Sequence, residues 1–163
     1  MTDKLEIIRS KIITVNNIQA CMSYYRFKEY RVVFTNGCFD IIHRGHIEYL
    51  AKAAGLGDVL IIGVNSDVSV RKIKGNSRPV QDENSRTLIL AAMHFTDRIV
   101  LFDDETPAGL IRLIRPDILV KGGDYNEADI VGADIVKETG GQVVTIEFIE
   151  GYSSSDIIKR IGN

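Results

Sequence analysis

The chain has 163 residues, a length that suits one domain with a full hydrophobic core. Its net charge of −2 gives no basic footprint for nucleic acid, and no apolar run is long enough to span a membrane, so neither is an expected partner. Two cysteines are too few for a disulfide framework or a zinc cluster, and the N-terminus lacks the layout of a signal peptide. We therefore expect a cytoplasmic protein.

Residues 1–30 are predicted to form an N-terminal helical appendage to the main domain. Apolar residues between positions 18 and 25 recur at helical spacing, after asparagines that can cap a helix. Aromatic side chains near Tyr24-Tyr25 and Phe27 are expected to be exposed. Such a surface permits a homodimer.

In residues 31–163, apolar strands alternate with helical segments, which predicts a single globular domain. Strands are predicted at Val32–Thr35, Val59–Val64, Arg98–Phe102, Ile118–Val120 and Val143–Phe148. Helices are predicted at Gly45–Ala54, from Asp82 onward, at Pro107–Ile114, at Ala128–Thr139 and at Ser153–Ile161. The helix after Asp82 is expected to bury Leu88, Ala91 and Ala92. The pattern predicts an α/β fold, a Rossmann-like three-layer sandwich with a five-stranded parallel sheet.

The segment between the first strand and the first helix of that sheet is the most informative one. It reads Asn36-Gly37-Cys38-Phe39-Asp40-Ile41-Ile42-His43-Arg44-Gly45-His46. Imidazoles can donate to phosphate oxygens, and Gly45 would let a phosphate approach the backbone at the helix start. Two other interpretations stay open: one histidine caps the helix while the other packs, or His43 and His46 bind a metal. No third metal ligand accompanies the two histidines.

Cys38 lies close to these histidines and could suggest a thiol nucleophile. The sequence supplies no evident oxyanion hole for such chemistry. We favour the interpretation that Cys38 is a small, partly buried thiol.

A basic cluster follows the second predicted strand and contains Arg71, Lys72, Lys74 and Arg78. Clusters of this kind are usually solvated loops. This one would lie at the carboxyl end of a strand, on the same sheet edge as His43, which favours phosphate binding.

Two further strand ends carry glycines or hydroxyl groups. The run Lys121-Gly122-Gly123-Asp124-Tyr125 permits a tight turn beside a ligand, although a plain turn would look the same. The serines Ser153, Ser154 and Ser155 open the last helix, where they can cap it or donate to an anion. Donors or glycines thus recur at four strand ends.

These motifs together resemble a known family. The Gly37–Asp40 and His43–His46 runs resemble the signature of the cytidylyltransferase-like nucleotidyltransferases, and Glu150–Ser155 resembles their second signature. The Phe34–Asp40 run, Lys74-Gly75, Arg78-Pro79 and Val120–Tyr125 are similar to the adenylyltransferases of ADP-heptose synthesis. No kinase domain accompanies them, so the expectation is the stand-alone form.

The resemblance implies that ATP and D-glycero-β-D-manno-heptose 1-phosphate are the substrates. The products would be ADP-heptose, for lipopolysaccharide core synthesis, and pyrophosphate. Mg²⁺ would accompany ATP, held mainly by phosphates and water, with no metal site of the protein's own.

The resemblance also implies roles for individual residues. The catalytic group would be His43, His46 and Lys74, and the groups that bind the sugar phosphate would be Asp40, Lys72 and Arg78. The nucleotide-binding set would be Asn36, Gly37, Cys38, Phe39, His43, Gly45, His46, Lys121, Gly122, Asp124, Ser153, Ser154 and Ser155. Related cytidylyltransferases often carry an arginine where this chain has Phe148 and Ile149. Lys121 or Arg78 would then have to hold the triphosphate.

Two other functions stay open at this point. One is a sibling cytidylyltransferase acting on glycerol 3-phosphate or another phospho-alcohol. The other is a non-catalytic nucleotide-binding module on the same fold. No residue in the sequence distinguishes adenine from cytosine, so the base preference does not follow from the residues themselves.

Overall fold

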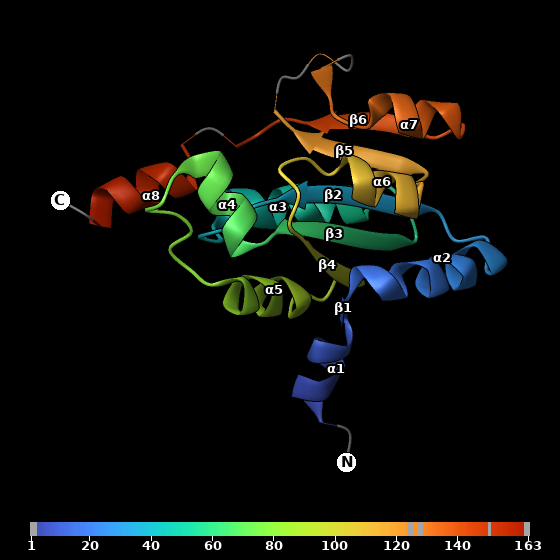
Figure 1. The fold of residues 1–163 in the computed structure, drawn as a ribbon, viewed down its shortest axis with the longest axis horizontal. Coiled ribbons are helices and arrows are strands. Elements are labelled where there is room, and N and C mark those ends of the chain that lie inside the picture. The colour runs from blue at the N-terminus through green and yellow to red at the C-terminus, as the bar shows by residue number, and fades with distance from the viewer. Residues whose placement is uncertain (1–2, 124–125, 127–128, 150, 162–163) are drawn as a thin grey trace.

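The computed structural model describes residues 3–123, 126, 129–149 and 151–161 (Figure 1). The described residues form one parallel sheet of six strands in the order β1-β4-β3-β2-β5-β6. The strands are β1 (Ile12–Ile13), β2 (Val32–Gly37), β3 (Val59–Asn65), β4 (Arg98–Phe102), β5 (Ile118–Gly122) and β6 (Gln142–Ile146). The helices are α1 (Lys4–Ser10), the 3₁₀ turn η1 (Val15–Asn17), α2 (Ile18–Phe27), α3 (Arg44–Ala54), α4 (Asp67–Lys74), α5 (Glu83–Ala91), α6 (Ala108–Ile114), α7 (Ala133–Glu138) and α8 (Ser154–Ile161).

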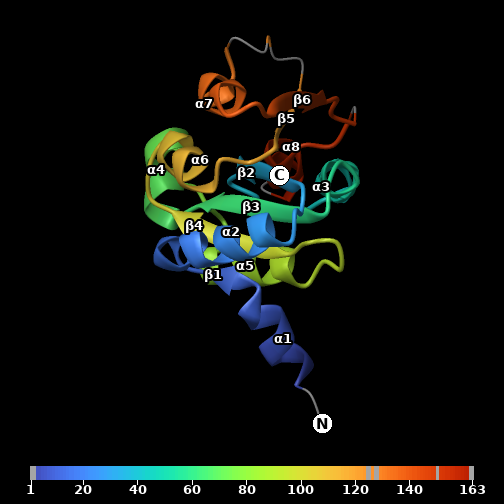
Figure 2. The same ribbon diagram turned by 90° about the vertical axis from the view of Figure 1, so that its right-hand side faces the viewer.

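Helices cover both faces of the sheet, as its apolar strands require (Figure 2). Helices α2, α6 and α7 share one core cluster with residues such as Phe34 and Ile61, while α3 and α5 share the other with Val33 and Ile62. The alternation of these residues between the two cores follows from the two-residue period of a strand. The α/β, Rossmann-like three-layer prediction is therefore confirmed. None of the described helices is long and apolar enough to cross a bilayer.

The sixth strand comes from residues 1–30, which were predicted to be a helical appendage. Ile12 and Ile13 pair with Ile99 and Val100 of β4, at the edge of the sheet. Helix α2 buries three apolar side chains, Ile18, Met22 and Tyr25, in the core that it shares with α6 and α7. This segment thus contributes to both the sheet and its core.

One helix was not predicted, and another begins later than predicted. The cationic residues 71–74 lie on a helix, α4, which Ser66 caps by accepting a hydrogen bond from the Ser69 amide. Helix α7 begins only at Ala133, because the preceding Gly132 has a left-handed φ of 88° that ends regular helix geometry.

The buried face of α5 was predicted only in part, because Ala91 is buried as expected, Leu88 is half-buried and Ala92 is not buried. The structure buries Arg86, Thr87, Leu90 and Ala91, while Ala92 is exposed. The buried face of α5 therefore includes a charged side chain, Arg86, which apolar spacing alone does not predict.

The sheet order reverses between β2 and β5. From β2 the chain moves to β3 and β4 on one side, and afterwards to β5 and β6 on the other. In open parallel sheets, ligands bind outside the carboxyl ends of the strands at such a switch point. Here those ends are Gly37 and Gly122.

Candidate functional site

A cavity of about 540 Å³ lies at this switch point. Its lining includes eleven of the predicted site residues: Asn36, Gly37, Cys38, Phe39, Asp40, His46, Lys74, Arg78, Lys121, Gly122 and Ser154. The other lining residues are Tyr49, Asn65, Ile73, Glu105, Thr106, Pro107, Asp129, Ile130, Val131 and Phe148. The structure thus brings together side chains from four strand ends, as the sequence indicated.

Five predicted site residues lie outside this lining, and one cannot be placed. His43, Gly45, Lys72, Ser153 and Ser155 do not line the cavity. Asp124 lies outside the described residues.

The two histidines form a stacked pair at the start of α3. Their ring centroids are 3.9 Å apart with an interplanar angle of 25°. Gly45 lies between them because a Cβ there would come within 3.1 Å of the His43 ring and 3.2 Å of the Cβ of Tyr152. The Phe39 ring meets the His46 ring edge-on at 5.4 Å. The pair is therefore fixed by packing from three sides.

Both imidazoles are neutral at pH 7. Burial lowers the pKa of His43, and burial together with the nearby His43 and Lys74 lowers the pKa of His46 to about 4. Among the described residues, the buried Nδ1 atoms of both histidines have no hydrogen-bond partner. Buried polar atoms are nearly always paired in native proteins, so these two are available to a bound ligand.

Three cationic side chains reach the cavity. Lys74 is exposed at the end of α4, and Arg78 follows it in the next loop, whereas Lys72 is exposed on α4 outside the lining. Lys121 is largely buried and its Nζ donates to Oδ1 of Asn36. Burial lowers the pKa of Lys121 to about 8, so it keeps its charge at neutral pH.

Asp40 is hydrogen-bonded to the loop over residues 78–81. Its carboxylate accepts from Nε of Arg78 at 2.6 Å and from the amides of Val80 and Gln81 at 2.8 and 2.9 Å. Burial raises the pKa of Asp40, but these hydrogen bonds outweigh it and hold the pKa below its ordinary value. Arg78 keeps a buried Nη2 with no partner in the described part of the chain. The pair leaves Arg78, rather than Asp40, with bonding capacity for a ligand.

The serines at the start of α8 are bound within the protein. Ser153 Oγ accepts from the amides of Ser155 and Asp156 and so caps the helix. Ser154 Oγ donates to the carbonyl oxygen of Ile41 at 2.9 Å, which attaches α8 to the histidine turn. The capping interpretation therefore holds for Ser153, and the amino end of α8 is the part directed to the site.

Cys38 has the environment of an unreactive thiol. It is partly buried, and burial raises its pKa above the ordinary value. A thiolate, the reactive form, is therefore scarce at pH 7. This supports the small partly buried thiol over the nucleophile.

Several residues in or near the site were not among the predicted site residues. Tyr49 is buried beneath the cavity, where its hydroxyl hydrogen-bonds Thr35 at 2.6 Å. Phe148 lies against Gly122, where a Cβ would come within 2.4 Å of the ring. Arg86 is fully buried behind the cavity. The sequence offers one sign that Arg86 faces inward. It lies four residues before Leu90, and residues i and i+4 share a helix face.

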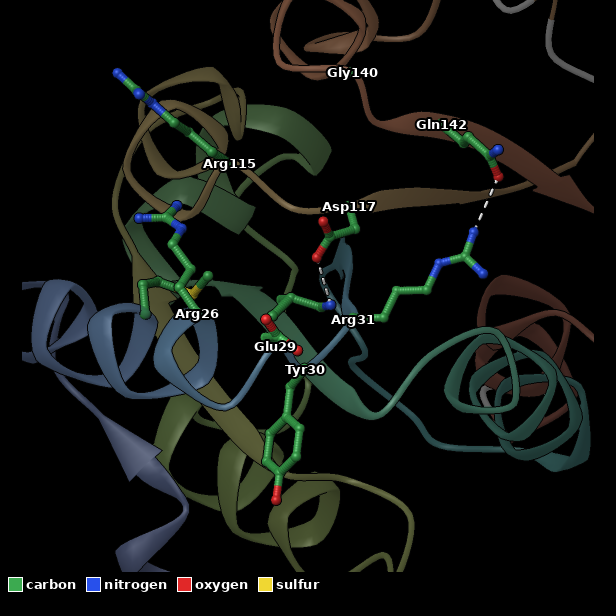
Figure 3. A pocket seen from close by; sticks show the side chains of 10 residues that line it. Arg26, Glu29, Tyr30, Arg31, Arg115, Asp117, Gly140 and Gln142 are labelled. Carbon is green, nitrogen blue, oxygen red and sulfur yellow. Dashed lines mark hydrogen bonds between the residues drawn. The ribbon is translucent and has the colours of Figure 1, made fainter.

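A second cavity, of about 430 Å³, lies at the opposite end of the sheet (Figure 3). Its lining consists of Met22, Arg26, Glu29, Tyr30, Arg31, Val32, Arg115, Asp117, Gly140 and Gln142. Arg26 donates to the carbonyl oxygen of Ile114 at the end of α6, and Arg31 donates to Gln142. Asp117 accepts from the amide of Val32. Helices α2 and α6 end here, and helix C-termini disfavour anions.

Comparison with known proteins tests the family suggested by these motifs. The family model described as cytidylyltransferase-like matches residues 34–160. The chain belongs to the cytidylyltransferase-like family. The matched range of this cytidylyltransferase-like chain contains every predicted site residue, including Asp124.

Curated relatives of this cytidylyltransferase-like chain include the bifunctional protein HldE of Wolinella succinogenes, 48% identical over 94% of the chain. HldE of Campylobacter jejuni subsp. doylei is 52% identical over 90% of the chain. Both alignments cover 31% of the relative, so the chain spans about a third of the length of these proteins. A solved structure, the lipopolysaccharide core biosynthesis protein of Thermoplasma volcanium, is 29% identical with a TM-score of 0.61, covering 76% of this chain and 99% of that one.

Proposed function

We propose that this chain transfers AMP from ATP to D-glycero-β-D-manno-heptose 1-phosphate, giving ADP-heptose and pyrophosphate for lipopolysaccharide core synthesis. One observation carries the proposal. Buried nitrogens of His46 and Arg78, which line the cavity at the switch point, and of His43, which stacks on His46 beside it, have no partner among the described residues. A nucleoside triphosphate supplies the oxygens that such groups need.

The choice of heptose phosphate rests on likeness. The Asn36–Asp40 and Lys121–Gly123 runs are similar to those of ADP-heptose adenylyltransferases. The 48% and 52% identity to HldE proteins supports the same choice. So does the related Thermoplasma protein, which is described as acting in lipopolysaccharide core biosynthesis.

The reaction is an in-line transfer at the α-phosphorus of ATP. A phosphate oxygen of the sugar attacks this atom, a new phosphorus–oxygen bond forms, and the bond to the β-phosphate oxygen breaks as pyrophosphate leaves. Such a step needs positioning and charge stabilisation rather than a protein nucleophile. His43 and His46 would stabilise charge on the α-phosphate and the leaving group, and Lys74 would support them. The amino end of α8, from Ser153 to Ser155, would face the β- and γ-phosphates.

The remaining polar groups would hold the two substrates. Lys121 and Arg78 would supply the positive charge that an arginine near Phe148 gives to related cytidylyltransferases. Lys72 and Arg78 would meet the phosphate of the sugar, with Asp40 holding Arg78 in place. Asn36 and the turn from Gly37 to Phe39 would line the nucleotide cleft.

Mg²⁺ would enter with ATP. Among the described residues, no group of three His, Cys, Asp or Glu side chains is placed to hold a metal. Asp40, the acidic side chain in the turn that precedes the histidines, already accepts three hydrogen bonds. Phosphate oxygens and water would therefore be the main ligands of the ion, which would neutralise charge on the leaving pyrophosphate.

A pyrophosphate-release assay tests the proposal by crossing ATP and CTP with heptose 1-phosphate and glycerol 3-phosphate. We expect turnover with ATP and heptose 1-phosphate. Turnover with CTP and glycerol 3-phosphate alone would instead identify a sibling cytidylyltransferase. Nucleotide binding without turnover on any acceptor would identify a non-catalytic module.

The proposed setting is the cytoplasm, where both cysteines, Cys21 and Cys38, would stay reduced, as they are here. The proposed assembly is a homodimer through the end of α2, where Tyr24 is 53% and Phe27 82% exposed. Sedimentation equilibrium of the wild type and of Phe27→Glu tests it, and a wild-type monomer at micromolar concentration would refute it.

A further inference from the structure

Arg86, on the inner face of α5, is 0% exposed. Its guanidinium donates to the carbonyl oxygen of Cys38, to that of Gln81 at 3.1 Å, and to Oδ1 of Asp67 at 2.9 Å. Burying a charge is costly unless good acceptors surround it, and the planar guanidinium fork suits several acceptors at once. The three acceptors belong to three segments that lead into the candidate site.

The first segment is the turn after β2. Phe39, which follows Cys38, has a left-handed φ of 47°, and its ring packs edge-on against His46. A non-glycine residue in that region is strained and persists only where its surroundings hold it. The hydrogen bond from Arg86 to Cys38 fixes this turn and, through Phe39, the side of the His46 ring.

The second segment is the loop over residues 78–81. The Asp40 carboxylate accepts hydrogen bonds from the backbone amides of Val80 and Gln81, and Arg86 donates to the carbonyl oxygen of Gln81. Both backbone N–H groups and a backbone carbonyl of the loop are therefore hydrogen-bonded to side chains outside it. Arg78, at the start of this loop, presents its unpartnered Nη2 from this fixed position.

The third segment is the first turn of α4. Oδ1 of Asp67 accepts a hydrogen bond from Arg86. The backbone amide of Asp67 donates to Glu83 of α5 at 2.8 Å. The same helix ends at Lys74, which lines the cavity. Helix α5 therefore holds α4 at the end opposite to its cationic residue.

We propose that Arg86 is a positioning residue for nucleotidyl transfer. By joining the Cys38 turn, the 78–81 loop and α4, it directs His46 and Arg78 at the reacting phosphates. The inference rests on the proposed function for its kinetic consequence. It goes further by assigning a role to a residue that does not line the cavity.

The test combines Arg86→Lys with Arg78→Ala in a double-mutant cycle, with kcat and KM measured by pyrophosphate release. Lysine keeps the charge but cannot reach three acceptors with a fixed fork. A displacement of about 1 Å can cost about 10²-fold in rate, so we expect Arg86→Lys to lower kcat by about that factor. In the Arg78→Ala background we expect a loss under about fivefold, because part of what Arg86 positions is already gone.

A matched control separates positioning from stability. Ile114→Ala removes a fully buried side chain of α6 at the other end of the sheet. It should destabilise the fold by an amount typical of core truncation while leaving kcat unchanged below its melting temperature. If Arg86→Lys does not fold, Asp67→Asn replaces it, because this change weakens one of the three bonds and keeps the other two.

A second readout is independent of activity. NMR titration can follow the imidazole of His46. The His46 pKa, about 4 in the wild type, should rise toward about 6.5 in Arg86→Lys as the turn loosens. An unchanged His46 titration together with wild-type kcat, or fully multiplicative losses in the cycle, would overturn the inference. If the wild type turns over no substrate pair, the proposed function fails, and the titration alone then decides whether Arg86 positions His46.

Discussion

The two ends of the sheet carry cavities of similar size, about 540 and 430 Å³, and both are lined by arginine. They differ in the state of their polar groups. At the amino end, Arg26 and Arg31 already donate to protein oxygens, and two helices end there. At the carboxyl end, nitrogens of His43, His46 and Arg78 have no partner among the described residues, and α3 and α8 begin there.

Under the proposed function, cavity size and arginine content do not distinguish the phosphate site from the other cavity. The amino ends of α3 and α8 and the nitrogens that have no partner among the described residues do distinguish it. An anion at the amino end would face helix C-termini and the carboxylates of Glu29 and Asp117. The following experiments test the contrast, from the largest expected effect to the smallest.

The strongest test removes one side chain at each end. His46→Ala should lower kcat by about 10²–10³, because a preorganised group at the reacting phosphate is lost. Arg115→Ala, at the amino-end cavity, should change kcat by less than about twofold. Circular dichroism should show both variants folded. Similar losses from the two changes would remove the distinction between the cavities.

Acid stability offers a second test. The His46 pKa is about 4 in the folded state, against about 6.5 unfolded, so between these values the unfolded chain binds more protons. The free energy of unfolding should therefore fall as the pH drops from about 6.5 to about 4, then level off with respect to this group. The full shift would correspond to about 3 kcal/mol, and because the ring is partly exposed we expect roughly 1–3 kcal/mol.

Urea denaturation of wild type and His46→Gln at pH 7 and pH 4.5 measures this term. The variant should lose less stability on acidification, because glutamine does not titrate. An equal loss in both proteins would mean that His46 is not held neutral by the fold.

The alkaline side tests Lys121. Its pKa of about 8 means that the cation is lost as the pH rises through that value. If it binds the triphosphate, kcat/KM for ATP should fall about tenfold between pH 7 and pH 9. Lys121→Arg should keep kcat/KM level over this range, because arginine does not titrate there. A fall of the same size in Lys121→Arg would assign the effect to another group.

The smallest effect is expected at Cys38. Cys38→Ser should retain kcat within about threefold, because the thiol pKa is raised and no thiolate is needed. Mass spectrometry of the wild type during turnover should show no nucleotidyl adduct on this residue. An inactive serine variant together with such an adduct would reverse the assignment.

Features with local causes could be predicted from the sequence. The five predicted strands are largely apolar runs, Asp82 caps α5 through the Ser85 amide, and Pro107 precedes α6. The strand-to-helix turn around His43 follows from glycines and imidazoles at fixed spacing. Together these features predict a ligand site at the carboxyl ends of the strands.

Features with distant causes could not be predicted. The hydrogen bonds from Arg78 to Asp40 and from Arg86 to Cys38 span 38 and 48 residues. Within α5, only the four-residue spacing from Arg86 to Leu90 indicates an inward-facing arginine, so the predicted apolar face was right at Ala91 and wrong at Ala92. Strand β1 has only two residues, too few to show the alternating apolar pattern of a strand. It forms because β4 offers a free edge with which it can pair.

That short strand has a consequence for solubility. An open sheet edge presents unpaired backbone groups to which another chain can add, and such edges promote aggregation. Ile12 and Ile13 cover the outer side of β4, and the amide of Ile99 donates to the carbonyl of Lys11. Deleting residues up to Ile13 would uncover β4, an apolar strand whose residues line neither of the two cavities. The damage would appear as self-association rather than as slower chemistry.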